Sequence, residues 1–205
     1  MAETVRMHLE PVTLGELRHG DHIAVKRKFE ELVPADLKLA ASLIKVFVTE
    51  DGYYRHHGVF LNDNVDRLAV MDFSGQTESD AKPRLRQIME FLSGCSDQDL
   101  FRVVYEDPSE CLSVDETVIK AREAVEQGNS WPSYHLFRNN CESFATFMKT
   151  GNAVSVQAMR ALTGVTNIGY GIGFAIGGSL GRSMAAAKIG GTIGGSLGQA
   201  YALRK

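Results

Sequence analysis

Cysteine is scarce in this sequence of 205 residues: Cys95, Cys111 and Cys141 are the only three, and none forms a CxxC pair. This odd, widely spaced set argues against a disulfide framework or a structural zinc site, and it favours a reducing compartment. An excess of positive charge is also missing, since the formal net charge is −3, so nucleic-acid binding is not expected. The N-terminal stretch lacks the apolar core of a signal peptide, which predicts a chain in or facing the cytosol.

Glycine, in contrast, is abundant but unevenly distributed. Of the 20 glycines, 12 lie between Gly164 and Gly198, and no charged residue occurs between Thr163 and Gly181. The overall composition is otherwise that of an ordinary soluble protein. The sequence therefore predicts two parts of different character, a globular domain and a hydrophobic, glycine-rich segment over residues 160–203.

Short apolar runs bounded by turn residues predict strands in the globular part, at residues 22–25, 53–61, 67–75 and 100–106. The second and third runs are separated by the turn-rich "NDNVD" and are expected to pair as an antiparallel hairpin. Residues 33–48 are ambiguous between helix and strand, and residues 79–95 fit a helix.

An amphipathic helix is expected over residues 113–129. Ser113 occupies the N-cap position with Glu116 three residues later, which is a capping box, and Gly128 ends the apolar pattern. A further helix follows near residue 140. Strands first and helices afterwards predict an α+β fold, with a small antiparallel sheet packed on helices.

Cys141 falls in the first turn of that last helix, which Asn139 or Asn140 caps and Gly151 closes. Unused backbone N–H groups and the helix dipole favour an anion at this position. A nucleophilic cysteine also needs a base nearby. Position alone leaves two interpretations open: a small buried side chain, which is the usual fate of a lone cysteine, or a nucleophile. Cys95 and Cys111 are interpreted as structural.

Two adjacent histidines, His56 and His57, lie on the predicted strand 53–61. Neighbouring residues of a strand point to opposite faces of the sheet, so only one of the two can face a given site. A histidine on a strand is more often structural than catalytic, and this pair alone does not define a site.

Four segments in order give the pair a context: "GDHIAV" (20–25), "YYRHHGVFL" (53–61), "RLAVMDFSG" (67–75) and "NNCESFATF" (139–147). Together they resemble the lecithin:retinol acyltransferase-domain family, which includes the H-Ras-like-suppressor phospholipase/acyltransferases. That family is a permuted branch of the NlpC-type cysteine peptidase superfamily. The resemblance covers residues 12–151 and implies a catalytic domain with a permuted NlpC/papain-like fold.

The resemblance also implies roles for individual residues. Cys141 matches the nucleophile of the family's Asn-Cys-Glu motif, and His56, two positions before Gly58, matches the base. Tyr54 matches an aromatic near the family's site that donates to the oxyanion. The supporting residues are therefore Tyr54, Asn140 and, as the fallback base, His57.

The third catalytic position departs from the family's pattern, which usually has a second histidine there. In "VMDFSG" this place is taken by Asp72. A carboxylate that accepts the imidazole N–H would fix the tautomer and favour the imidazolium. If Asp72 is instead a solvated turn residue, the site is a cysteine–histidine dyad.

The expected reaction is acyl transfer through a thioester on Cys141, with no cofactor and no metal. The resemblance implies a phospholipid or other acyl-lipid donor, and either phospholipase A activity or transfer to an amine or alcohol. Two alternatives stay open. One is a cysteine amidase or peptidase with the same triad, and the other is a catalytically weak membrane-remodelling or scaffold protein that acts through its glycine-rich segment.

The glycine-rich segment contains a repeat, "IGFAIGGSLG" (172–181) and "IGGTIGGSLG" (189–198), whose glycines recur every fourth residue. On a helix this spacing forms the smooth groove of a glycine zipper. We expect residues 164–202 to insert into a membrane, as a single pass or a hairpin, or to form a homo-oligomer, on a cytoplasmic, membrane-associated protein. The alternative is a flexible linker or a soluble helical hairpin.

Overall fold

The structure is a computed structural model of the chain, and it describes residues 5–28, 53–75, 79–135 and 139–160. The chain divides into two compact units. The first consists of Met1–Pro34 and Tyr53–Ser155, and the second of Ala35–Gly52 and Val156–Lys205. All strands and helices below belong to the first unit.

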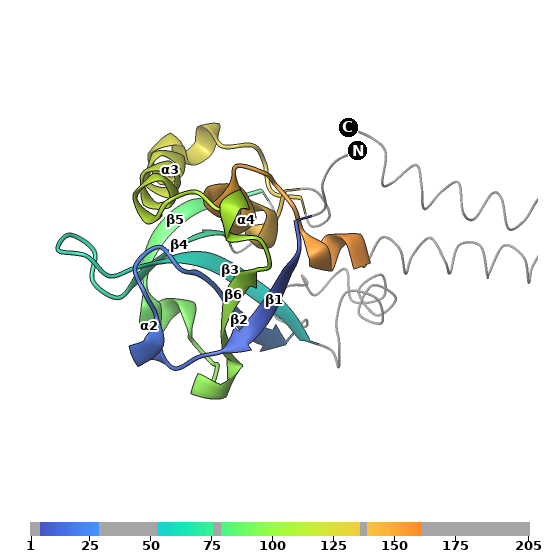
Figure 1. Ribbon diagram of the computed structural model, residues 1–205. Coiled ribbons are helices and arrows are strands. Elements are labelled where there is room, and N and C mark those ends of the chain that lie inside the picture. The colour runs from blue at the N-terminus through green and yellow to red at the C-terminus, as the bar shows by residue number, and fades with distance from the viewer. Residues whose placement is uncertain (1–4, 29–52, 76–78, 136–138, 161–205) are drawn as a thin grey trace, which may run out of the picture. The chain divides into compact units, whose positions relative to one another are not determined.

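Six strands form one antiparallel sheet with the order β1-β6-β2-β3-β4-β5 (Figure 1). Their bounds are Met7–Pro11 (β1), His22–Lys28 (β2), Tyr53–Leu61 (β3), Ala69–Ser74 (β4), Lys82–Gln87 (β5) and Leu100–Tyr105 (β6). The four predicted strands are β2, β3, β4 and β6, and β3 and β4 form the expected antiparallel hairpin. The α+β fold class is confirmed.

Three α-helices among the described residues of the first unit accompany the sheet: α2 (Ile88–Phe91), α3 (Val114–Gln127) and α4 (Cys141–Thr150). The capping box at the start of α3 is present, because Ser113 Oγ accepts from the N–H of Glu116 and the Glu116 carboxylate accepts from the N–H of Ser113. Gly128 ends the helix at φ +52°, a conformation that favours glycine.

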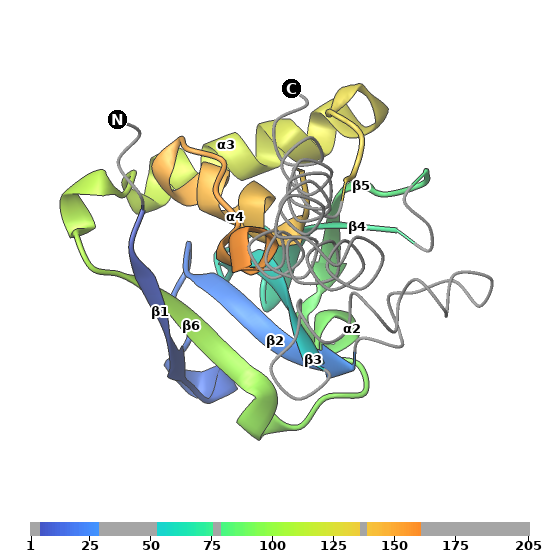
Figure 2. The same ribbon diagram turned by 90° about the vertical axis from the view of Figure 1, so that its right-hand side faces the viewer.

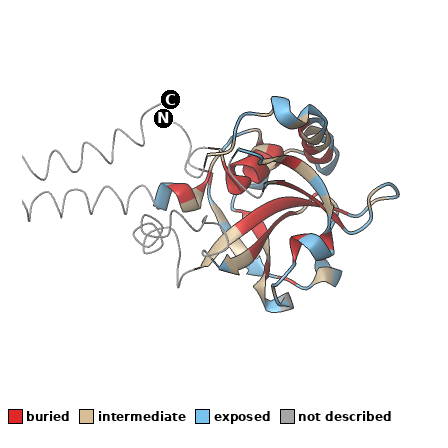
Figure 3. Ribbon diagram, turned by 180° about the vertical axis from the view of Figure 1, so that it is seen from behind, coloured by how far each residue is buried: buried red, intermediate tan, exposed pale blue. Residues whose placement is uncertain are grey.

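Each face of the sheet buries its own apolar cluster. On one face, α3 and α4 pack side by side over β3, β4 and β5, and bury Val59, Met71 and Phe73 with Phe144 and Met148 (Figure 2). The other face buries Ile23, Val25, Phe60 and Val70 against α2. As a result the central strands are buried on both sides (Figure 3).

The helix predicted at residues 79–95 is wrong for most of its length. Lys82–Gln87 is strand β5, at the edge of the sheet, and only Ile88–Phe91 is helical. Pro83 disfavours a helix here, and pairing with β4 supplies the backbone hydrogen bonds instead. The sequence also gave no sign of β1, which pairs with the distant β6. Residues 33–48, and the predicted glycine-rich segment beyond residue 160, lie outside the described residues.

Gly58 lets β3 approach its neighbours closely. A Cβ at this position would lie 2.5 Å from Cγ1 of Val70, 3.0 Å from the carbonyl oxygen of Met71 and 3.3 Å from Phe91. Val70 and Phe91 are fully buried, so neither has room to move.

We therefore expect Gly58→Ala to lower the free energy of unfolding by about 1–3 kcal/mol, because the added methyl overpacks this contact. Urea unfolding of the purified protein measures the loss. Gly15→Ala is the matched control, since a Cβ at Gly15 meets nothing within 4 Å. Equal stability of the two variants would contradict the close-approach argument.

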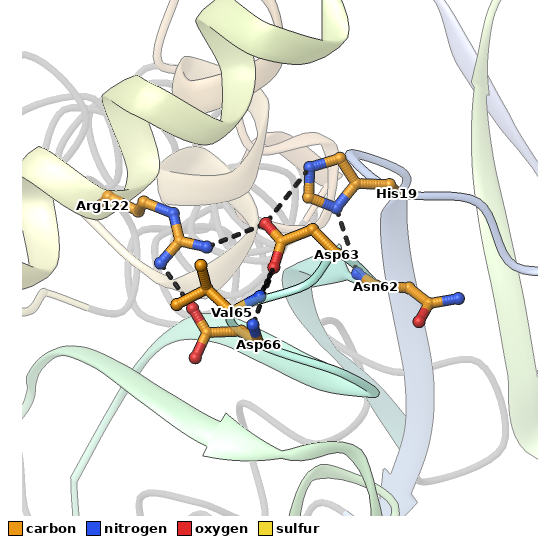
Figure 4. Close-up of polar contacts among 6 residues, drawn as sticks. All are labelled: His19, Asn62, Asp63, Val65, Asp66 and Arg122. Carbon is orange, nitrogen blue, oxygen red and sulfur yellow. Dashed lines mark hydrogen bonds and ion pairs between the residues drawn. The ribbon is translucent and has the colours of Figure 1, made fainter.

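The loop between β3 and β4 is held by a polar cluster (Figure 4). Arg122 of α3 forms ion pairs with Asp63 and Asp66. His19 accepts from the N–H of Asn62 at 3.0 Å and lies 3.7 Å from Asp63. These contacts fix the end of the hairpin that is remote from His56.

Candidate active site

Helix α4 begins at Cys141, with Asn140 as its N-cap. The Asn140 side chain accepts from the N–H of Ser143 at 2.9 Å, so Asn140, and not Asn139, is the capping residue. Gly151 closes the helix at φ +77°. Cys141 thus stands in the first helical turn, as expected, and is 5% exposed.

His56 and Asp72 meet on one face of the β3–β4 hairpin. The Nε2–H of His56 donates to Oδ2 of Asp72 at 2.7 Å. Asp72 has no exposed surface, so the alternative of a solvated turn residue is excluded. Because the carboxylate takes up Nε2, Nδ1 is the nitrogen left to exchange a proton with a thiol.

Cys141 reaches β3 beyond the end of the pairing between β3 and β4. That pairing runs from Gly58 to Leu61, and Arg55 and His56 come before it, opposite Lys26 and Val25 of β2. The Cys141 sulfur lies 4.0 Å from the carbonyl oxygen of Arg55, directly before His56. The structure thus brings Cys141, His56 and Asp72 together from α4, β3 and β4.

The electrostatics of His56 reflect these two neighbours. Burial alone lowers the pKa of His56, but the charge of Cys141 and the hydrogen bonds that His56 makes to Asp72 and Cys141 outweigh burial and raise the pKa to about 9. When Cys141 is a thiolate, the imidazolium is therefore the favoured form of His56 at neutral pH. The Phe91 ring, 5.2 Å from the imidazole, covers it from α2.

The Asp72 carboxylate has two further partners. Ser74 Oγ donates to Oδ1 at 2.9 Å, and Arg86 Nε forms an ion pair with Oδ2 at 3.3 Å. Arg86 also donates to Ser74 Oγ at 2.6 Å. Sequence reasoning did not include Ser74 or Arg86. A buried carboxylate needs a counter-charge, and this requirement was the available reason to look for an arginine near Asp72.

His57, the fallback base, lies on the opposite face of β3 and does not share the Asp72 contact. Its Nδ1 is hydrogen-bonded to Nε2 of His22 at 2.8 Å, and His22 Nδ1 to the Tyr105 hydroxyl at 2.8 Å. Burial lowers the pKa of His22 to about 3 and holds the pKa of His57 well below its usual value. Both rings are therefore neutral in the folded protein.

This buried pair predicts acid sensitivity. An unfolded histidine has a pKa near 6.5, so below that pH the unfolded chain binds protons that folded His22 and His57 do not. The free energy of unfolding therefore falls as the pH drops, by about 2 kcal/mol at pH 5 for His22 alone. The raised pKa of His56 acts in the opposite direction: its contribution to stability grows as the pH falls from 7.5 and is fully present only below pH 6.5. It offsets part of the loss, and it cancels when wild type is compared with a His22 variant.

Urea unfolding at pH 7.5 and pH 5 measures the loss. His22→Gln keeps a hydrogen-bonding side chain but removes the titration, so the variant should lose less stability between the two pH values. The same pH dependence in wild type and variant would refute the role of His22.

A second buried network surrounds the start of α4. Ser155 Oγ donates to the Glu142 carboxylate at 2.6 Å, and Asn140 Nδ2 donates to Ser155 Oγ at 3.1 Å. Ser155 thus links the two residues that flank Cys141 in sequence. Sequence reasoning also missed Glu142 and Ser155.

Tyr54, the predicted supporting residue, lies on β3 two residues before His56. It is on the same face as His56 and opposite Arg27 of β2.

No helix among the described residues is both long and apolar enough to cross a membrane.

Comparison with known proteins agrees with the motifs. A family model described as lecithin retinol acyltransferase matches residues 15–154. Phospholipase A and acyltransferase 1 of Rattus norvegicus is 29% identical over 126 residues, which cover 58% of this chain and 74% of the relative. Its Homo sapiens counterpart is 27% identical over 121 residues, which cover 55% and 69%. The resemblance noted in the sequence is confirmed, and the chain belongs to the lecithin retinol acyltransferase family.

Proposed function

We propose that this chain is a cysteine-dependent acyltransferase or phospholipase A, which forms an acyl-thioester on Cys141 from a lipid ester at a membrane surface. The proposal is carried by the contacts that run from Asp72 through His56 to Cys141 in a member of this family. The relatives' printed name, which combines phospholipase A and acyltransferase, supports the reaction class.

In the first step, Nδ1 of His56 accepts the thiol proton and the thiolate attacks the ester carbonyl carbon. A C–S bond forms and the carbonyl oxygen becomes an oxyanion. The oxyanion accepts from the backbone N–H of Cys141, since the first N–H groups of an α-helix have no partner within it. Tyr54, on the same face as His56, is the supporting donor. The ester C–O bond then breaks, and the imidazolium protonates the leaving oxygen.

In the second step, His56 takes a proton from water, an alcohol or an amine. The activated oxygen or nitrogen attacks the thioester carbonyl, and the C–S bond breaks to restore the thiolate. Water as the acceptor gives a free fatty acid, which is phospholipase A activity. An alcohol or amine gives a new ester or amide, which is acyl transfer.

The proposed membrane surface rests on the sequence of residues 164–202, with its glycine-zipper spacing and lack of charge before Arg182. Residues that insert into a bilayer, or assemble on it, would hold the domain near its substrate and raise the effective substrate concentration. The corresponding location is the cytoplasmic side of a membrane.

The test is to incubate the full chain with phosphatidylcholine vesicles and to analyse the intact protein and its peptides by mass spectrometry. We expect one acyl chain on the peptide that contains Cys141, released by neutral hydroxylamine and absent from Cys141→Ser. Acylation by a peptide or amide donor, but not by phospholipid, would overturn the lipid assignment in favour of an amidase. Phospholipid cleavage that Cys141→Ser leaves intact would overturn the thiol mechanism.

A further inference from the structure

In addition to His56, a closed ring of polar contacts holds Asp72. Ser74 Oγ donates to Oδ1 of Asp72, Arg86 donates to Ser74 Oγ, and the Arg86 guanidinium forms an ion pair with Oδ2. Oδ2 is also the atom that accepts from His56. Both carboxylate oxygens are therefore fixed in direction.

The sheet register explains why Arg86 reaches this carboxylate. In the β4–β5 pairing, Val70 is opposite Arg86 and Asp72 is opposite Arg84. Arg86 and Asp72 are thus diagonal neighbours on the same face, within reach of a long side chain. The Arg86 side chain is 26% exposed and that of Asp72 is 0% exposed, so the ion pair joins a partly solvated cation to a buried anion.

A buried carboxylate is unfavourable unless charge and hydrogen bonds compensate it. His56 compensates only while it carries its second proton, and in the proposed reaction it gives that proton to the leaving group. Arg86 is charged at every stage. It supplies the counter-charge of Asp72 at the stage in which His56 is neutral.

We propose that Arg86, with Ser74, is a positioning residue that supplies the counter-charge of Asp72 and holds its carboxylate aimed at His56, so that a carboxylate at position 72 functions only together with Arg86. This inference rests on the proposed function, because it concerns the third member of the same site. A neutral imidazole at position 72 would need no counter-charge, and it would leave the Arg86 guanidinium without its carboxylate partner.

The neighbouring charges provide a matched control. Arg84 is on the same strand and the same face, but its Nε donates to the carbonyl oxygen of Ser74 and its guanidinium pairs with Asp80. From β2, Arg27 donates to the Phe91 carbonyl oxygen. The charged groups that act on the proton affinity of His56 are Cys141 and Asp72. Arg84→Gln therefore removes one charge from β5 without touching the Asp72 carboxylate.

The first experiment measures the rate of Cys141 alkylation by iodoacetamide from pH 5 to pH 10, in a Cys95→Ser/Cys111→Ser background. This readout needs no acyl donor. Removing a cation raises the pKa of nearby groups, so Arg86→Gln should move the pH profile to higher pH by about half to one unit. Arg86→Lys should restore the profile, and Arg84→Gln should leave it in place. Superimposable profiles for wild type and Arg86→Gln would overturn the proposal.

The second experiment is a double-mutant cycle with Asp72→His and Arg86→Gln. Asp72→His alone should lower kcat/KM for phospholipid about 100-fold, and Arg86→Gln in the same chain should recover at least about tenfold of that loss. Independent effects, in which the losses simply multiply, would overturn the coupling. Urea unfolding at pH 7.5 identifies any variant that fails to fold, and the cycle is then read from Arg86→Met, which also removes the charge, in place of Arg86→Gln.

The two proposals fail in different ways. If Cys141 of the wild type reacts no faster at pH 6.5 than a free thiol, the proposed nucleophile is wrong. If it reacts fast and Arg86→Gln behaves as Arg84→Gln does, only the role of Arg86 is wrong.

Discussion

Replacement of Cys141 with serine is expected to lower kcat/KM for phospholipid by about 10³-fold or more, because a nucleophile and its base act as one unit. The change exchanges one atom at a buried position at the start of α4. A serine hydroxyl keeps its proton beside His56, whereas a thiol gives its proton up. Released fatty acid, measured from labelled vesicles, reports the loss.

Cys111→Ser is the matched control. Cys111 is a partly buried free cysteine packed against the cluster around Val103 and Tyr105, away from His56. We expect this variant to keep activity within a factor of about two of wild type. Equal losses in the two variants would mean that the serine substitution harms the fold and not the chemistry.

His56→Asn should lower kcat/KM by a comparable factor and change the pH dependence of the thiol. In the wild type, the raised pKa of His56 keeps the imidazolium present up to about pH 9, and an imidazolium beside a sulfur favours the thiolate form. Without His56, an ordinary thiol with a pKa near 8.5 is about 1% ionised at pH 6.5. Alkylation of Cys141 at that pH should therefore be slowed about 100-fold.

Two other histidines test whether the effect belongs to His56. His19→Asn makes the same chemical change at the remote end of the hairpin, where His19 contacts Asn62 and Asp63, and should leave alkylation unchanged. His57→Asn should lower stability, since it breaks the bond to His22, but should keep the wild-type alkylation profile. If His57→Asn shifts the alkylation profile of Cys141 and His56→Asn does not, the base is His57 and the assignment of His56 is wrong.

The parts of the candidate site that depend on local sequence pattern were predictable. Strand alternation separated His56 from His57, and an Asx cap followed by an apolar face placed Cys141 in the first turn of a helix. The proximity of Cys141 to His56 depends on contacts between segments far apart in sequence, and only the family resemblance suggested it. The roles assigned to Cys141, His56 and Asp72 remain predictions that the variants above will test.

The part of the site that sequence reasoning missed lies where the fold was predicted wrongly. Residues 79–95 have apolar side chains at helical spacing, which favoured a helix, but pairing with β4 makes Lys82–Gln87 a strand. A helix would have given no reason to place Arg86 beside Asp72. Whether an edge strand forms depends more on its partner strand than on its own composition. Because β5 was not predicted, the proximity of Arg86 to Asp72 was not predicted either.

The buried pair of His22 and His57 shows a similar limit. The sequence indicated a short strand at residues 22–25, but not that its histidine lies opposite β3 and bonds to His57. Such a contact depends on the register of two strands, which a single strand's pattern does not determine.

The order of the site residues along the chain has a consequence for protein synthesis. His56 and Asp72 lie on neighbouring strands of one hairpin and leave the ribosome well before Cys141. At about 5–20 residues per second, translation separates them by several seconds. The nascent chain can assemble its histidine–carboxylate pair in that time, but the cysteine is last to arrive. A reactive thiolate therefore arises only when the domain is nearly complete, and unfinished chains are protected from premature acylation or oxidation at this residue.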